Sequence, residues 1–442
     1  MSLRGGRTDP AYRAGEGRGG KGWVAMVVRN EAVYVRRRRV ALLVVVAFVA
    51  LSVLGVSRLV GVLSGGSAEA AAPRPTPVKA AVSRPGIPVP KPSPVEPQGD
   101  PGPSAKTAMV RVLRLTGGLT PKSVVASKQG LVFAQNMMYT HSVVAFRADG
   151  ARLQSIDDSV DLSEFGVKGH PGTSKGSPVE VAFTPDGRYA WVSNYSMYGK
   201  GYGPEGLDTC TKGDGTSPST VYRIDTRTYA IDKVVAVGSV PKYVAVTPDG
   251  KTVLVTNWCS WDLSIIDASS GRETARIPLG GKYPRGVAVS PDSRTAYVAL
   301  MGSDRVVRVD LRGRAVHAYA QTGDGPRHIV ESPDGRYLYV TNNGDGTVSK
   351  LERSTGKVLK WVRTGSQPRS MAISPDGAAI YSVNYESSTV TKLRTSDLEV
   401  VDEVKTDYHP IGITYEPTRK MVWVACYGGS ILVFDDSRLP VA

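Results

Sequence analysis

The chain returns at a nearly constant interval to one pattern, seen most clearly as PRHIVESPDGRYLYVTNN at 326–343. Copies of this pattern open at Pro121, Pro178, Pro241, Pro284, Pro326, Pro368 and Pro410, and the last four openings are each 42 residues apart. A fixed period of about 40 residues that holds four short strands is the signature of a β-propeller blade. The repeat therefore constrains the fold more than any other feature of the sequence.

Each repeat is predicted to form four strands. In the copy that opens at Pro326, alternating, β-branched and aromatic residues favour strands at 327–331, 336–341, 347–351 and 357–364. The first two of these are separated by Ser-Pro-Asp-Gly, which is typical of a tight turn. No helical periodicity of useful length competes with this prediction.

The two ends of the repeat region predict how the ring closes. The seventh copy ends after its third strand, at 430–435, so its fourth strand is missing. Residues 107–117 (TAMVRVLRLTG) resemble a fourth strand, and we expect them to complete the last blade and remove its open edge. A loose leader strand is the alternative. The predicted fold class is all-β, a seven-bladed β-propeller of four-stranded blades over 107–442.

The segment before the propeller predicts a membrane anchor. Residues 1–39 hold ten Lys and Arg against three Asp and Glu, and we expect a disordered basic cytoplasmic tail. Residues 40–63 contain a long uncharged apolar run, which predicts one transmembrane helix acting as a signal anchor. The arginines at 36–39 place the N-terminus in the cytoplasm. The predicted localisation is a single-pass protein of the cell membrane, with the propeller outside the cytoplasm.

The anchor leads into a Pro-rich linker, predicted to be extracytoplasmic, at 64–106. Proline imposes an extended, semi-rigid conformation, so the linker would hold the propeller away from the membrane. Cleavage near Ala68-Glu69-Ala70, as in a signal peptide, is the alternative to a retained anchor.

The distribution of charge excludes nucleic acid as a partner. The whole chain has a net charge of +15, but residues 1–106 carry most of that excess. A nucleic-acid-binding protein needs its basic residues on a folded face. We therefore expect no nucleic-acid binding by the propeller.

The repeat carries a family resemblance. The motif YVTN is present literally at 339–342, with the related LVTN at 254–257 and SVNY at 382–385. With the SPDG turn and the G-x-x-P-R link, this resembles the YVTN-type seven-bladed β-propeller family of prokaryotic surface and exported proteins. Lactonase-like propellers and the haem d1 domain of nitrite reductase share this architecture, so the resemblance implies a fold more strongly than an activity.

Strand topology predicts a ring of polar groups on one face of the propeller. Because consecutive strands alternate in direction, the links between blades and the loops after each second strand share a face. The candidate ligand-binding residues there are Lys242, Arg285, Arg327, Arg369, Asn194, Asn257, Asn342, Asn384, Tyr195, Trp258, Tyr385 and Tyr427. Guanidinium groups match carboxylates and phosphates, so the ring suits an anionic or sugar-bearing ligand. The alternative is structural: Asn caps its own loop, and Arg bonds the backbone of a neighbouring blade.

The second repeat is irregular on this same face. It carries an insertion at 197–217 and a long preceding link at 157–177, and long loops of this kind often bind partners. Cys210 in the insertion and Cys259 in the next blade are predicted to form a disulfide, which export to an oxidising compartment permits. Cys426 is expected to be a buried free thiol.

Catalytic motifs are absent from the sequence. It has no haem-attachment motif and no phosphate-binding loop. Glu180 and His328 are weak candidates for a general acid or base. We predict a monomeric, non-enzymatic binding module without metal or cofactor, whose partner is a cell-wall or surface component or another exported protein. The alternative is a lactonase-like or other hydrolytic propeller enzyme with its site at the channel mouth.

Overall fold

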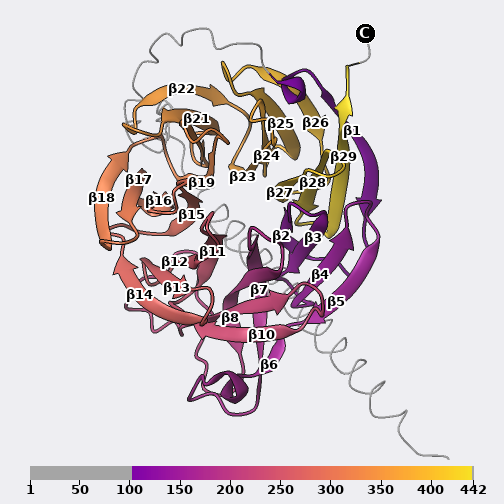
Figure 1. The fold of residues 1–442 in the computed structure, drawn as a ribbon. Coiled ribbons are helices and arrows are strands. Elements are labelled where there is room, and N and C mark those ends of the chain that lie inside the picture. Colours follow the sequence, from indigo (N-terminus) through magenta and orange to yellow (C-terminus); the bar gives the residue numbers. More distant parts are fainter. Residues whose placement is uncertain (1–101, 441–442) are drawn as a thin grey trace, which may run out of the picture. The chain divides into compact units, whose positions relative to one another are not determined.

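The structure is a computed structural model that describes residues 102–440, and these residues form seven sheets arranged in a ring (Figure 1). The chain passes from blade to blade in sequence order, and every strand pair within a blade is antiparallel. The first strand of each blade lies toward the centre of the ring and the fourth toward its periphery (Figure 1). The predicted seven-bladed propeller is confirmed.

The innermost strands of blades 1 to 7 are β2 (Pro121–Ala126), β7 (Thr173–Phe183), β11 (Pro241–Val246), β15 (Pro284–Val289), β19 (Pro326–Glu331), β23 (Pro368–Ile373) and β27 (Pro410–Glu416). The second strands are β3 (Leu131–Asn136), β8 (Tyr189–Tyr198), β12 (Thr252–Asn257), β16 (Thr295–Leu300), β20 (Tyr337–Asn342), β24 (Ala379–Asn384) and β28 (Met421–Cys426). The third strands are β4 (Ser142–Arg147), β9 (Thr220–Asp225), β13 (Asp262–Asp267), β17 (Arg305–Asp310), β21 (Thr347–Glu352), β25 (Thr389–Arg394) and β29 (Ser430–Arg438). The fourth strands are β5 (Arg152–Asp157), β10 (Ile231–Ala236), β14 (Arg272–Pro278), β18 (Ala315–Ala320), β22 (Val358–Arg363), β26 (Val400–Lys405) and, in blade 7, β1 (Ala108–Leu115).

The Ser-Pro-Asp-Gly turn joins the first two strands of a blade through its own side chains. In blade 5, the Ser332 hydroxyl donates to the Asp334 carboxylate at 2.6 Å, and the Arg336 N–H donates to the same carboxylate at 3.0 Å. Gly335 has a positive φ of 67° and closes the turn by donating its N–H to the Ser332 carbonyl at 2.8 Å. Glycine adopts this backbone conformation without a steric penalty, which explains its position in the motif.

Neighbouring blades bury apolar side chains against each other. One cluster joins Leu254 and Leu263 of blade 3 to Val298 and Val307 of blade 4, and all four side chains are buried. A single four-stranded sheet buries only one face against each neighbour, so the stacked ring forms a continuous core.

The N-terminal strand closes the ring, as the sequence predicts. β1 pairs with β29 in the sheet of blade 7, and the two lie beside each other in Figure 1. A buried ion pair next to this junction joins Lys392 Nζ of blade 6 to Asp436 Oδ1 at 2.6 Å. Lys392 also donates to the Thr107 carbonyl at 2.7 Å, so one side chain contacts both ends of the propeller.

Blade 2 differs from the prediction of four strands. The short strand β6 (Ser159–Asp161) adds to the innermost strand β7, which makes a five-stranded sheet. A 3₁₀ helix, η2 (Leu162–Phe165), follows β6. The extra pairing exists because β7 and β8 run past the usual strand ends, with Lys175 opposite Tyr198. The segments predicted as a long link and an insertion therefore hold each other in part. A third 3₁₀ helix, η3 (Met301–Ser303), follows β16 in blade 4.

The described chain begins at Gly102 with a 3₁₀ turn, η1 (Pro103–Ala105), whose Ser104 N–H donates to Asp376 of blade 6 at 3.0 Å. The predicted tail, the signal anchor and most of the Pro-rich linker lie outside the described residues. Within residues 102–440 no helix has the length and apolar character needed to cross a membrane.

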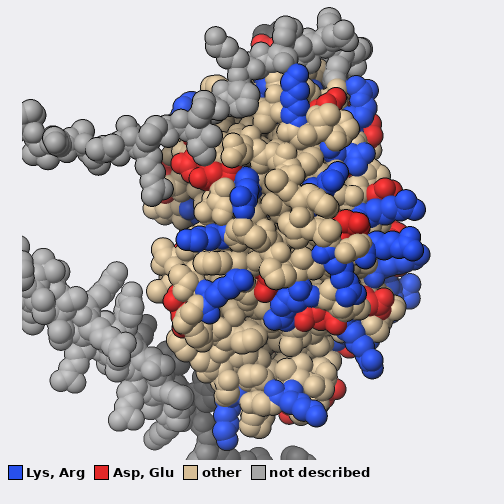
Figure 2. All heavy atoms as spheres, turned by 90° about the vertical axis from the view of Figure 1, so that its left-hand side faces the viewer, with Lys and Arg blue, Asp and Glu red and all other residues tan. Residues whose placement is uncertain are grey.

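The side of the propeller that faces the viewer in Figure 2 carries both signs of charge. Lys and Arg side chains are interspersed with Asp and Glu, and uncharged residues separate them. The outer strands of this side therefore present a mixed surface.

Candidate functional site

A chamber of about 590 Å³ lies at the end of the propeller axis formed by the links and the loops after the second strands. Its walls repeat from blade to blade. The residue that follows each second strand, or its counterpart in the longer β8, lines it in every blade described: Met137, Tyr195, Trp258, Met301, Asn343, Tyr385 and Tyr427. The residue after the repeat proline lines it in five blades: Lys122, Lys242, Arg327, Arg369 and Ile411. Glu205 and Asp208 reach it from the insertion, and Tyr283 and Gly302 complete the wall.

The floor of the chamber is cationic and buried. Arg327 is 8% exposed and Arg285, just behind the lining, is 7% exposed. Burial and the charge of Arg285 lower the pKa of Arg327 well below its usual value. Burial, followed by the neighbouring arginines, lowers the pKa of Lys122 in the same way. Cations so close together repel one another, and an anion in the chamber would relieve that repulsion.

The three arginines of this region keep hydrogen-bonding capacity in reserve. Within the described residues, the buried Nε atoms of Arg285, Arg327 and Arg369 have no hydrogen-bond partner. A buried donor without a partner is costly, and a bound ligand would be one way to satisfy it. Arg285 also donates from Nη1 to the Lys242 carbonyl of the preceding blade. Arg285 therefore bonds to the backbone of a neighbouring blade, as the structural alternative predicts. It lies behind the residues that form the chamber floor.

Lys242 lies in an aromatic cage at one end of the chamber. Its Nζ lies 3.8 Å from the centre of the Trp258 ring and 5.3 Å from that of Tyr195. Its ammonium group pairs with the Asp208 carboxylate, which the insertion supplies. Burial lowers the pKa of Lys242 to about 7, against the opposing effect of Asp208. Trp258 stacks in turn on Tyr283, with ring centres 4.7 Å apart.

Arg369 lies against a ladder of rings at the other end. Its guanidinium carbon is 3.5 Å from the centre of the Tyr385 ring. Tyr385 stacks on His409 at 3.9 Å, and His409 stacks on Tyr408 at 3.5 Å. Tyr427 contacts the edge of the group at 6.4 Å from Tyr385. These flat apolar faces beside cations suit a ligand that has both an anionic group and a flat ring.

The structure places the four candidate asparagines inside the blades, where none of them lines the chamber. Each is fully buried: Asn194, Asn257, Asn342 and Asn384. The Asn342 Nδ2 group donates to the Thr322 carbonyl at 3.0 Å and to the Ser349 hydroxyl at 2.9 Å. Asn384 makes the equivalent bonds one blade later. These asparagines therefore have a structural role, as the alternative interpretation predicts. The residue that follows each of them lines the chamber instead.

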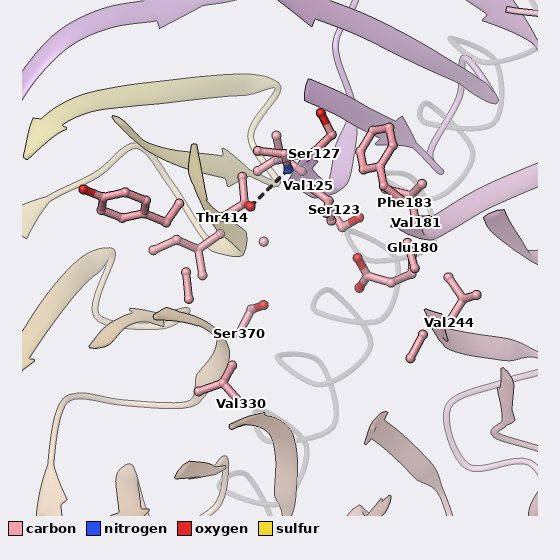
Figure 3. Close-up of a pocket in the computed structure, with 18 of the residues that line it drawn as sticks. Ser123, Val125, Ser127, Glu180, Val181, Phe183, Val244, Val330, Ser370 and Thr414 are labelled. Carbon is pink, nitrogen blue, oxygen red and sulfur yellow. Dashed lines mark hydrogen bonds between the residues drawn. The ribbon is translucent and has the colours of Figure 1, made fainter. Parts of the chain in front are cut away.

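Glu180 and His328 line a second cavity, of about 530 Å³, on the side of the turns between the first and second strands. Figure 3 shows the Glu180 carboxylate pointing into this cavity, with Ser123 and Ser370 around it. Burial raises the pKa of Glu180, while Arg285 and the Ser123 hydroxyl act in the opposite direction. Glu180 is therefore a buried acid beside the cationic floor, on its opposite side from the chamber.

His328 is held by hydrogen bonds at both nitrogens. Its Nδ1 accepts the Met371 N–H at 2.9 Å, so Nε2 carries the proton in the neutral ring and donates to the Tyr243 hydroxyl at 2.9 Å. Burial and the nearby arginines lower its pKa to about 3. His328 is thus a neutral structural side chain in this geometry, with no free nitrogen for acid–base work.

The predicted disulfide is present. Cys210 is bonded to Cys259 across blades 2 and 3, with Cα atoms 5.4 Å apart, and Cys426 is a buried free thiol. Five further residues line the chamber although they were not predicted from the sequence: Asp208, Glu205, Tyr283, Met137 and Met301. The signal that identifies two of these, Met137 and Met301, was available, because the position after the strand end is the same in every repeat.

Residues 102–440 define a seven-bladed β-propeller with a cationic chamber at one end of its axis. Part of the chain matches the family model described as "Lactonase, 7-bladed beta-propeller", at residues 220–360. Another part matches the cytochrome D1 heme domain, at residues 325–425. No curated protein matches the chain.

Among solved structures, the chain is similar to Kuenenia stuttgartiensis hydrazine synthase. The TM-score is 0.56 at 20% sequence identity, and the match covers 72% of this chain and 96% of that chain. At this identity the similarity concerns the fold.

The match to a heme domain raises the question of an axial ligand. Haem iron is often held by a histidine with a free nitrogen. His328 has both nitrogens engaged, and His409 lies between Tyr385 and Tyr408 with Nε2 at 3.4 Å from the Glu386 carboxylate. His328 therefore does not fit the role of a haem ligand.

Proposed function

We propose that this protein is a YVTN-type propeller, anchored in the cell membrane and displayed outside the cytoplasm, that binds an anionic, ring-bearing ligand in the cationic chamber. Its natural ligand would be a cell-wall or surface component, or a group on another exported protein. The observation that carries the proposal is the pair of chamber-lining arginines, Arg327 and Arg369, whose Nε atoms have no partner within the described residues. Buried guanidinium donors beside aromatic faces are suited to a carboxylate on a flat body.

The charged residues that line the chamber favour the binding of an anion. Lys122, Lys242, Arg327 and Arg369 line it against Glu205 and Asp208, and Arg285 lies behind them. An entering anion would be attracted by this excess of positive charge, more strongly at low ionic strength than at high.

Binding can be tested with benzoate as the anionic probe and benzamide as its neutral counterpart. The full-length chain should bind benzoate and not benzamide in isothermal titration calorimetry, and added salt should weaken the binding. Arg327→Gln and Arg369→Gln should each reduce benzoate affinity about tenfold or more, because each removes a charge-assisted donor. Arg294→Gln, in an exposed turn at the opposite end, is the matched control and should bind as the wild type does. Equal binding of both probes would refute the proposal.

A hydrolytic enzyme is the second candidate, favoured by the lactonase match and by Glu180 in its own cavity. Glu180 would act as the general base, since its carboxylate is buried beside Arg285 and the Ser123 hydroxyl. His328 would position Tyr243 and take no part in proton transfer. Turnover of simple lactones that is lost in Glu180→Gln but retained in Arg369→Gln would establish this candidate and place the chemistry in the second cavity.

A further inference from the structure

The insertion of blade 2 places one short turn over the chamber, and this turn, Gly206–Cys210, is fixed at both ends. Cys210 is bonded to Cys259, and the Tyr195 hydroxyl donates to the Gly206 carbonyl at 2.7 Å. Gly206 is packed so closely that a Cβ atom there would lie 2.5 Å from Cγ2 of Val240. The turn therefore has little freedom to move away from the chamber.

This turn brings a carboxylate into the cationic site. The Asp208 carbonyl accepts the Trp258 Nε1–H at 3.0 Å, and the Asp208 carboxylate pairs with Lys242. The Asp208 side chain is 81% exposed, whereas that of Lys242 is 10% exposed. Burial alone would raise the pKa of Asp208, but Lys242 outweighs it, with further help from Lys122 and Arg327, so the pKa is lowered. Asp208 therefore places an anion of the protein itself at the Lys242 end of the chamber.

The chamber consequently has two unequal ends. At the Lys242 end, Trp258, Tyr195 and Asp208 already surround the ammonium group. At the Arg369 end, the Nε atoms of Arg327 and Arg369 lack partners and no carboxylate of the described residues pairs with them. Among the described residues that line the chamber, the arginines with an unpartnered Nε atom are therefore at this second end.

We propose that Asp208 is a built-in competitor that fills the Lys242 end of the chamber and restricts the site to ligands with a single anionic group. This rests on the proposed function. The ligand's one carboxylate would bind Arg327 and Arg369, and its flat ring would lie against Tyr427 and the edge of Tyr385. A second carboxylate on the same ring would meet Asp208 and be repelled, because like charges at short range in a partly buried site disfavour binding.

The test compares benzoate with isophthalate, which has the same ring and two carboxylates. The wild-type full-length chain should bind benzoate more tightly than isophthalate. In Asp208→Asn the affinity for isophthalate should rise about tenfold or more, and it should rise by a clearly larger factor than the affinity for benzoate, whose single carboxylate would bind at the other end of the chamber. Asp214→Asn is the matched control, because its carboxylate lies in the same insertion and accepts hydrogen bonds from Thr211, from the N–H at 2.7 Å and from the hydroxyl at 2.7 Å.

The outcomes separate this inference from the function on which it rests. A gain of the same size for both probes in Asp208→Asn, no gain, or a loss of isophthalate binding would overturn the role of Asp208 while leaving anion binding intact. Absence of binding of either probe to either chain would overturn both proposals. Because the Asp208 side chain is mostly exposed, Asp208→Asn should keep the wild-type fold, and circular dichroism checks this.

Discussion

Asp158 is a buried acid with an unusual environment. It is 2% exposed, and neither oxygen of its carboxyl group has a hydrogen-bond partner within the described residues. Lys175 Nζ lies 3.9 Å away, and Asp157 is adjacent in the chain. Burial raises the pKa of Asp158 to about 8, because desolvation disfavours the ionised form more than Lys175 favours it.

This pKa predicts how stability depends on pH. The folded pKa exceeds the unfolded value, so the native state holds a proton between about pH 4 and 8 that the unfolded chain releases. The stabilisation is fully present below pH 4 and is lost as pH rises through 8. Asp158→Asn should therefore become more stable than the wild type above pH 8, by on the order of 1–5 kcal/mol. Denaturant unfolding at pH 5, 7 and 9 measures the difference.

Asp157→Asn provides the control for that experiment. Its side chain is 70% exposed and hydrogen bonds to Ser159 lower its pKa, so it titrates well below the window. A wild-type and Asp158→Asn pair whose stabilities change in parallel from pH 5 to 9 would contradict the assignment.

Strand geometry explains why the sequence predicted some of the chamber residues correctly and misplaced others. Successive residues of a strand point to opposite faces, so a site assigned one residue too early falls inside the sheet. Asn257 is buried in its blade, whereas Trp258 lines the chamber. Asp208 carries no repeat signature, and only the folded insertion shows that it reaches Lys242.

Strand β1 closes the ring. The side chains that it buries do not alternate strictly along the strand with those that it exposes. Register shifts between Ala108 and Val110 and between Arg111 and Leu113 change which side chains point inward. Met109 is 5% exposed and packs with Phe434 and Val390, while Val112 is 38% exposed. The Met109 N–H also donates to the Asp402 carboxylate at 2.7 Å.

Because β1 packs against blade 7, replacing a buried residue of this strand should lower the free energy of unfolding more than replacing an exposed one. Met109→Ala should lower the free energy of unfolding by about 2–5 kcal/mol, because it leaves a cavity between blades 6 and 7. Val112→Ala should change it by less than about 0.5 kcal/mol, since that side chain is already partly in water. Chemical denaturation of the full-length chain compares them. Equal effects would show that β1 does not pack as described.

The strands that belong to the repeat pattern could be predicted from the sequence, whereas β6 could not. In the repeat that opens at Pro326, the PDG turn and the alternating apolar residues predicted four strands whose bounds agree with those of β19 to β22 to within about one residue. β6 has three residues in a segment without alternation, and it forms because the extended β7 offers it an edge. Short pairings of this kind depend on tertiary context rather than on local propensity.

On the scale of the whole molecule, the chamber is a product of the ring. Every blade of the described propeller contributes at least one lining residue, so the site exists only when the first and last blades meet at β1 and β29. The Lys392–Asp436 pair and its bond to Thr107 place charged groups at that junction, where removing one partner would leave a buried charge. Ligand binding and ring closure are therefore expected to be coupled.

The last prediction concerns where the ring is displayed. Residues 36–63 predict an anchor that leaves the propeller outside the cytoplasm, and the disulfide offers an independent readout, because such bonds persist in oxidising compartments. Protease added to intact cells should remove the propeller, and peptide mapping of the non-reduced protein should join Cys210 to Cys259. The chain without residues 1–63, retained in the cytoplasm, should keep three free thiols. Full protection from protease, together with reduced Cys210 and Cys259 in the native chain, would reverse the predicted topology.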